Sequence, residues 1–153
     1  MLELLRKHFA AFDASDWDTY KADLAPNATY EEVATGQIAK GRDQYIEAIK
    51  RWKTPFPDLK ATVVNAYSVG DIVVAELQWV GTQAGPLPTP FGILPPTNKV
   101  GSVKAVLIAK MKDGLIIESR HYFDLMTVFM QAGAGAALAG LPTKAAETVA
   151  RPH

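Results

Sequence analysis

The sequence predicts one domain of the α+β class with a mostly antiparallel sheet. Two observations support this prediction. Apolar residues at helical spacing dominate the first third of the chain, whereas extended segments rich in valine and alanine dominate residues 60–123. Helices and strands are therefore grouped along the chain, which argues against an alternating βαβ fold. A chain of 153 residues with 48% hydrophobic residues is also long enough to bury one core.

Four helices are predicted from apolar stripes and from residues that favour helix ends. The stripe of the first helix consists of Leu2, Leu5, Phe9 and Phe12. Residues 15–18 resemble a capping box, and prolines end two of the helical patterns. The other three helices are predicted at about 16–24, at 42–53 and at 125–132.

Five strands are predicted between segments rich in turn-forming residues. Their ranges are about 28–33, 60–68, 72–82, 100–111 and 115–123. Gly70 and Gly114 lie in short connections that join the last four strands in pairs, so two hairpins are expected. Residues 36–41 are predicted to be a loop.

Two further segments differ in composition from the rest of the chain. Residues 84–98 contain five of the ten prolines interleaved with apolar residues, so we expect an ordered loop that covers a pocket. Residues 134–153 are rich in alanine and glycine and carry little bulk for a core. We therefore expect a domain over 1–133 and an appended tail over 134–153.

Charge and composition argue against several functional classes. Lys plus Arg and Asp plus Glu both total 16, whereas a nucleic-acid-binding protein usually has a basic excess. The chain has no cysteine, which fits a reducing cytoplasm. Charged residues interrupt the apolar N-terminus, so neither a signal peptide nor a membrane span is predicted. No metal-binding spacing of histidines and no glycine-rich nucleotide motif is present, so we expect no metal and no cofactor.

Two stretches resemble the SnoaL-like polyketide cyclases, a family of the nuclear transport factor 2-like superfamily. WVGTQAGPL (79–87) with LPPTNKV (94–100) resembles the family's W-x-G-T-H-x-G … PPTG segment. KDGLIIESRHYFDLMTVFMQAG (112–133) resembles the family's ending, DGKI…Y-x-D…L…Q-L-G. The resemblance covers about residues 1–133. It implies a curved sheet wrapped around helices into a cone with an apolar pocket, and a homodimer through the outer sheet face.

The resemblance also assigns a function to Asp124. In the cyclases the matching aspartate is the acid/base of an intramolecular aldol closure, and in the related limonene-epoxide hydrolases an aspartate in the same Y-F-D place activates water. This chain departs from both patterns. Leu107 and Gln83 stand at the cyclases' histidine positions, and residues 81–83 lack the hydrolases' Arg-x-Asp pair. Neither catalytic set is complete.

From the residues alone, Asp124 has two interpretations. Aspartate is a favoured N-cap, and its carboxylate could accept from the backbone N–H of Met126 or Thr127. Alternatively, burial among Tyr122, Phe123 and the following apolar residues would raise its pKa and make it an acid/base group. The two roles are compatible.

Tyr30 and Glu32 are the next candidates, because residues two apart on a strand share a face. The resemblance adds that the epoxide hydrolases hold their reacting water with a tyrosine and an asparagine in this arrangement. If Glu32 and Asp124 both face the pocket, one of the two carboxylates would keep a proton. The alternative is that Glu32 is a solvated residue at the end of a strand.

Four residues are predicted to contact a ligand: Gln83 through its amide, and Trp79, Phe91 and Phe56 as apolar lining. By strand alternation His121 faces away from Asp124, so we expect it on the dimer-side surface. His8 lies off the stripe of the first helix and is expected to be exposed.

The sequence therefore predicts a cofactor-independent enzyme of the cyclase or isomerase type. It would act on a small hydrophobic carbonyl compound through Asp124, with Tyr30, Glu32 and Gln83 as hydrogen-bonding partners. The first alternative is a dimer that binds a small hydrophobic molecule without catalysis. The second is a structural or partner-binding dimer whose cavity is filled by side chains.

Overall fold

The computed structural model describes residues 1–139. Its helices are α1 (Leu2–Ala14), α2 (Trp17–Ala22), α3 (Arg42–Lys50), α4 (Leu125–Ala132), α5 (Gly135–Ala139) and the 3₁₀ helix η1 (Arg51–Lys53). Its strands are β1 (Leu24–Glu32), β2 (Gln37–Lys40), β3 (Lys60–Val69), β4 (Ile72–Thr82), β5 (Leu87–Thr89), β6 (Gly92–Leu94), β7 (Val100–Lys112) and β8 (Leu115–Phe123).

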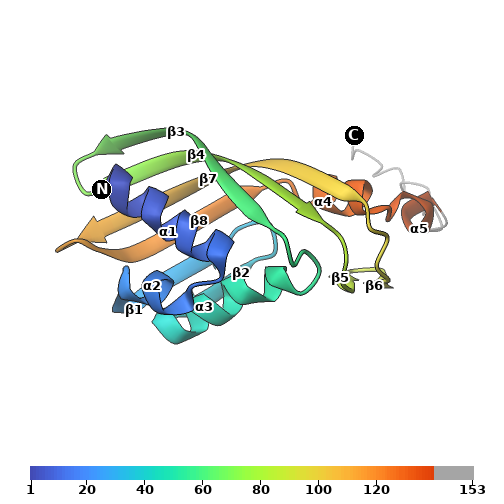
Figure 1. Cartoon of the computed structure of the whole chain (residues 1–153), viewed down its shortest axis with the longest axis horizontal. Coiled ribbons are helices and arrows are strands. Elements are labelled where there is room, and N and C mark those ends of the chain that lie inside the picture. The colour runs from blue at the N-terminus through green and yellow to red at the C-terminus, as the bar shows by residue number, and fades with distance from the viewer. Residues whose placement is uncertain (140–153) are drawn as a thin grey trace, which may run out of the picture.

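Six strands form one curved sheet in the order β2-β1-β8-β7-β4-β3 (Figure 1). Neighbouring strands are antiparallel except for β1 and β8, which run parallel. Two long hairpins, β3–β4 and β7–β8, make up most of the sheet. The predicted α+β class with a mostly antiparallel sheet is confirmed.

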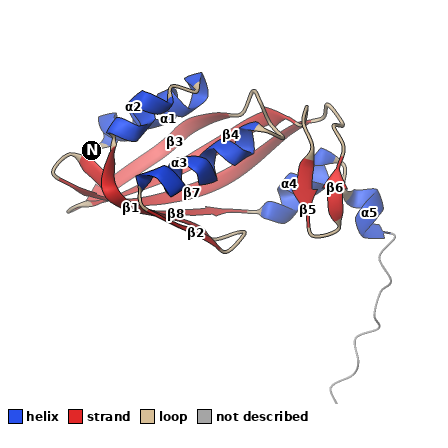
Figure 2. Ribbon diagram, turned by 90° about the horizontal axis from the view of Figure 1, so that it is seen from below, coloured by secondary structure: helices blue, strands red, loops and turns tan. Residues whose placement is uncertain are grey.

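The N-terminal helices cover one face of this sheet (Figures 1 and 2). Helix α1 packs against β3, and α3 packs against β1. The predicted stripe of α1 does form its buried side, with Leu5, Phe9 and Phe12 each at most 6% exposed. The alternation of β4 then places Val73, Ala75 and Leu77 in the same core, because every second side chain points toward the helices. This alternation also decides which side chains reach the site.

The structure differs from the sequence-based prediction at three segments. Residues 37–40 of the predicted loop form strand β2, which pairs with β1. The predicted helix 42–53 is α3 followed by η1, and the change of helix type redirects residues 51–53. The proline-rich loop contains the small hairpin β5–β6. Strands β2, β5 and β6 are only three or four residues long and take their extended form by pairing with the strand next to them in sequence.

The predicted tail is described only in part. Ala134 is 2% exposed and packs beside Phe129 and Ala132 at the end of α4. Residues 140–153 lie outside the described residues. None of the helices in residues 1–139 has the length and hydropathy of a membrane-spanning segment.

Candidate active site

An apolar cavity of about 70 Å³ lies between the inner face of the sheet, the η1 region and α4. Its aromatic lining consists of Phe12, Tyr30, Trp52, Phe56, Trp79 and Phe123. The polar residues among the lining are His121, Lys99, Ser102 and Gln131. Pockets for drug-sized ligands usually measure about 300–1,000 Å³. In this conformation the cavity therefore holds only a small molecule or one part of a larger one.

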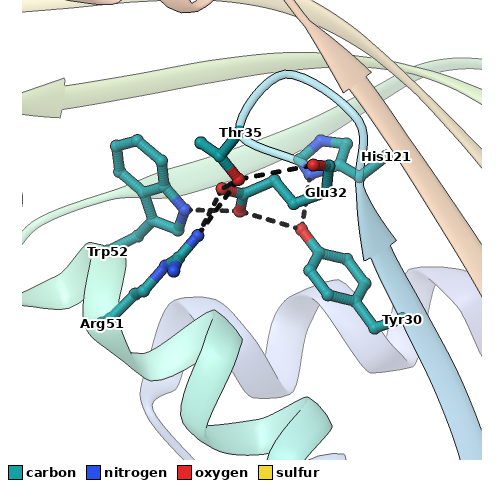
Figure 3. Close-up of polar contacts among 6 residues, drawn as sticks. All are labelled: Tyr30, Glu32, Thr35, Arg51, Trp52 and His121. Atoms are coloured by element: carbon teal, nitrogen blue, oxygen red, sulfur yellow. Dashed lines mark hydrogen bonds and ion pairs between the residues drawn. The ribbon is translucent and has the colours of Figure 1, made fainter. Parts of the chain in front are cut away.

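A buried carboxylate, Glu32, bonds two of the residues that line this cavity, Tyr30 and Trp52. Figure 3 shows this carboxylate with its hydrogen-bonding partners. Glu32, at the end of β1, is 0% exposed and accepts hydrogen bonds from four side chains. Arg51 and Thr35 bond Oε1 at 2.5 and 2.7 Å. Trp52 and Tyr30 bond Oε2 at 2.7 and 3.2 Å. Burial of a carboxylate is unfavourable unless such donors replace its lost hydration, so this set accounts for a buried Glu32.

The local fold explains why these donors meet. The i, i+2 relation on β1 directs Tyr30 and Glu32 to the same face, as predicted. The parallel pairing of β1 with β8 sets Glu32 opposite His121. The 3₁₀ turn η1 then brings two consecutive side chains, Arg51 and Trp52, onto the same carboxylate.

The hydrogen bonds around His121 have a defined direction. Trp79 Nε1 lies 3.2 Å from His121 Nε2, and because an indole can only donate, Nε2 is the acceptor. Neutral His121 therefore carries its hydrogen on Nδ1, which lies 3.1 Å from Tyr30 Oη. Tyr30 in turn donates to Glu32. The result is a chain from Trp79 through His121 and Tyr30 to the carboxylate.

Burial controls the protonation of this chain. It lowers the pKa of His121 to about 4, an effect that the nearby negative charge of Glu32 only partly opposes. It also raises the pKa of Tyr30 well above its ordinary value, again helped by Glu32. Near neutral pH His121 is thus a neutral base and Tyr30 a neutral hydroxyl group.

Acid is expected to destabilise the protein through its buried histidines. The pKa of His121 is lower in the folded than in the unfolded chain, so its stabilising contribution is complete above about pH 6.5 and is lost as the pH falls toward about 4. The pKa of His8 is lowered by burial as well, so it acts in the same direction.

Between about pH 7.5 and 4.5, we expect His121 alone to remove roughly 2–3 kcal/mol from the free energy of unfolding. Urea unfolding at a series of pH values measures this loss. A free energy that does not change over that interval would contradict the neutral, buried state of His121.

The prediction that Asp124 faces the pocket is wrong. Asp124 is exposed and is the N-cap of α4, where it accepts from the N–H of Thr127 at 3.2 Å and from its hydroxyl at 2.6 Å. These bonds hold the pKa of Asp124 below its ordinary value, opposite to the rise expected from burial. No shared pair of carboxylates forms, and Arg51 lies beside Glu32 instead.

Replacing Asp124 by alanine is expected to lower the melting temperature by a few degrees because α4 loses its cap. Ligand affinity in the cavity should stay unchanged, since Asp124 is not among the lining residues. Thermal unfolding and tryptophan fluorescence titration measure the two quantities. A loss of ligand binding without a loss of stability would restore a direct role for this carboxylate.

Gln83 lies away from the cavity and organises the proline-rich loop. It is 0% exposed, and its amide nitrogen donates to the carbonyls of Gly85 and Pro95 at 2.8 and 3.1 Å. Its amide oxygen accepts from both the N–H and the hydroxyl of Thr97. Because these bonds use the whole amide, the prediction that Gln83 reaches a substrate is wrong.

The aromatic candidates divide into two groups. Trp79 and Phe56 line the cavity, and their contact with a ligand stays a prediction. Phe91 lies outside the lining, at the tip of the β5–β6 hairpin, and is 43% exposed. The hairpin turns it outward.

Both histidine predictions were wrong. His121 and Asp124 point to opposite sides, as strand alternation predicts. However, His121 is the one that points toward the interior, where it is 8% exposed. The pairing of Glu32 with His121 is the signal that would have shown this, and it appears only once β1 and β8 are known to be neighbours. His8 is 1% exposed, bonds Asp23 at 3.3 Å and stacks on Tyr20.

Within residues 1–139, no three His, Asp or Glu side chains converge in a way that could hold a metal ion.

Solved structures of other proteins share this arrangement of helices and sheet. A protein from Jannaschia sp. CCS1 assigned to the SnoaL-like polyketide cyclases is 26% identical, with a TM-score of 0.77 over 87% of this chain and 91% of that one. A Catenulispora acidiphila protein solved with trimethylamine is 23% identical, with a TM-score of 0.72 over 86% and 92%. IdmH from Streptomyces antibioticus, assigned as a polyketide cyclase, is 23% identical, with a TM-score of 0.76 over 86% and 96%.

These comparisons define the fold as ketosteroid isomerase-like, the term used for the Catenulispora protein. The family model of the SnoaL-like polyketide cyclases matches residues 3–132, which is most of the chain. The protein belongs to this family. No curated protein matches the sequence.

Proposed function

We propose that the protein is a cofactor-independent enzyme of the cyclase or isomerase type that binds a small hydrophobic carbonyl compound in its cavity. The observation that carries this proposal is the position of His121, which lines an apolar cavity and has an acceptor nitrogen, Nε2. Its other nitrogen bonds Tyr30, which in turn donates to Glu32. A base oriented by a second group, itself fixed by a carboxylate, is the usual arrangement for proton transfer.

The proposed reaction begins when a carbonyl group enters between Trp79 and His121. The indole N–H of Trp79 then donates to the carbonyl oxygen instead of to His121 Nε2. Nε2 takes a proton from the carbon next to the carbonyl, and the electrons of that C–H bond form an enolate whose negative oxygen is held by Trp79. The new imidazolium is stabilised through Tyr30 by the charge of Glu32.

The enolate carbon has two possible fates within this scheme. It can attack a second carbonyl of the same molecule, which closes a ring, or it can be reprotonated at another position, which isomerises the substrate. His121 returns its proton in either case, so no outside oxidant or cofactor is needed. A base with a pKa of about 4–5 suffices for such chemistry where the enolate oxygen is stabilised.

Cyclohexanone in D₂O provides a direct test. The protein should accelerate exchange of the protons next to the carbonyl, with saturation, as followed by ¹H NMR. Free imidazole at equal concentration is the reference. Exchange no faster than with imidazole, despite binding shown by tryptophan fluorescence, would refute the catalytic proposal.

One observation favours the alternative of binding without catalysis. Both nitrogens of His121 already have partners, Trp79 and Tyr30, so the base is masked until a ligand separates it from Trp79. A pocket protein would keep this hydrogen bond when a ligand binds. The ¹⁵N–¹⁵N coupling across the hydrogen bond from the Trp79 indole to His121 Nε2, which is lost only if that bond breaks, distinguishes the two candidates.

We also propose that the protein is a homodimer formed through the outer face of the sheet. Tyr67, Val80 and Tyr122 are 57%, 42% and 38% exposed there, and a second copy could bury them. Sedimentation equilibrium measures the mass. Replacing Tyr122 by glutamate should shift it toward the monomer, and a wild-type mass of one chain would contradict the proposal.

A further inference from the structure

The cavity has an exposed polar rim as well as a buried polar floor. His121 and Tyr30 are 8% and 1% exposed, whereas Lys99 and Gln131 line the cavity and are exposed. Lys99 stands just before β7, well before Leu107, the β7 residue that pairs with His121. The rim and the floor therefore lie at different points along the strand, so one elongated ligand can meet both.

Lys99 gives this rim a positive charge. Among the described residues that line the cavity, it is the only Lys, Arg, Asp or Glu. Within residues 1–139, its ammonium group takes part in no ion pair, whereas the buried carboxylate of Glu32 is already paired with Arg51. As far as residues 1–139 are concerned, the rim thus presents a cation without a counter-ion beside an apolar space.

Gln131 adds a second donor to the lining of the same cavity. Its amide oxygen accepts from the backbone N–H of Ser102 at 2.5 Å, which fixes the orientation of the amide. The amide nitrogen therefore points the other way, and among the described residues it has no hydrogen-bond acceptor. Lys99 and Gln131 together offer donors for a group that can only accept.

Two glycines lie beside the ends of these side chains. A Cβ atom on Gly101 would lie 3.2 Å from the amide oxygen of Gln131. A Cβ atom on Gly133 would lie 3.2 Å from the Lys99 ammonium, and the positive φ of 100° at Gly133 also favours glycine. The ends of both side chains therefore lie against glycine backbone.

We infer that the ligand is an apolar oxo acid whose carboxylate lies at the rim beside Lys99 and Gln131 and whose carbonyl group reaches His121. This inference deepens the proposed function and rests on it for the carbonyl end. The carboxylate end stands on the charge and the donors of the rim. An uncharged apolar ligand would leave both exposed donors to water and gain nothing from the charge of Lys99.

Hexanoate and hexanamide test the carboxylate end, because they differ only in the charged group. Tryptophan fluorescence reports binding, since Trp52 and Trp79 line the cavity. Replacing Lys99 by methionine should weaken hexanoate about threefold to fivefold, the usual effect of an exposed ion pair, and leave hexanamide within about twofold. Replacing Lys99 by glutamate should weaken hexanoate further. High salt should weaken hexanoate binding to the wild type but not to the Lys99→Met variant.

Lys104→Met is the matched control, because Lys104 is an exposed lysine of β7 outside the cavity lining. It should change neither affinity. Equal hexanoate affinity in the wild type and Lys99→Met would overturn the inference and leave cyclohexanone exchange untouched. If the protein does not accelerate proton exchange of cyclohexanone but Lys99→Met still weakens hexanoate binding, only the catalytic proposal is refuted. If neither hexanoate nor cyclohexanone binds to the wild type, both the inference and the catalytic proposal fail.

Discussion

Replacing His121 by asparagine is expected to slow proton exchange of cyclohexanone by about a hundredfold or more, the usual effect of removing a general base. Asparagine is close in size and can still bond Tyr30, but it cannot take up a proton. Cyclohexanone should still bind, because the apolar lining is unchanged. Exchange by ¹H NMR and binding by tryptophan fluorescence separate the two effects.

His8→Asn is the matched control for this variant. Within residues 1–139, His8 is the other buried histidine, but it bonds Asp23 and does not line the cavity. This variant should lose stability and keep its exchange rate. In the wild type, the rate should fall as the pH drops through about 4, where His121 becomes protonated. An unchanged rate in His121→Asn would remove this residue from the mechanism.

The second large effect is expected at Glu32. Replacing it by leucine leaves Tyr30, Trp52 and Thr35 without their acceptor and Arg51 without its counter-ion. Removing one partner of such a buried network lowers the free energy of unfolding by about 3–5 kcal/mol. Arg51 is 41% exposed and can be solvated by water, which places the effect near the lower end of that range.

Glu32→Gln tests the role of Glu32 in the reaction separately from its role in folding. Glutamine retains an acceptor for Trp52 and Tyr30, so we expect a smaller loss of stability. The charge that raises the pKa of His121 is gone, so the acid limb of the exchange profile should move to lower pH. A purely structural role would leave that limb in place. Urea unfolding and the pH–rate profile measure the two effects.

Most of the fold could be predicted from the sequence because its signals are local. Periodicity marked the first helix and the long hairpins, and glycine marked the turns between their strands. Strand β2 was missed because residues 37–40 are too short to show a period and are extended only by pairing with β1. The family resemblance, now shown by the match over residues 3–132, rested on local motifs as well.

The candidate site was harder to predict because it depends on contacts between distant segments. Tyr30 and Glu32 were found from their spacing on one strand, but Arg51 and Trp52 reach them only through the turn after α3. Alternation gave the relation between His121 and Asp124 correctly but could not say which side is the interior. The family motif then favoured Asp124, although its carboxylate caps a helix.

The parallel pairing of β1 with β8 has a consequence for how the protein is made. Tyr30 and His121 are 91 residues apart in sequence. During synthesis β1 leaves the ribosome long before its partner exists, whereas β3–β4 and β7–β8 can close as local hairpins. Contacts of long sequence separation form late, because loop closure opposes them until the rest is in place. The contact between Tyr30 and His121 is therefore expected to form in one of the last folding steps, and its appearance in a pulse-labelling refolding experiment would time the completion of the native state.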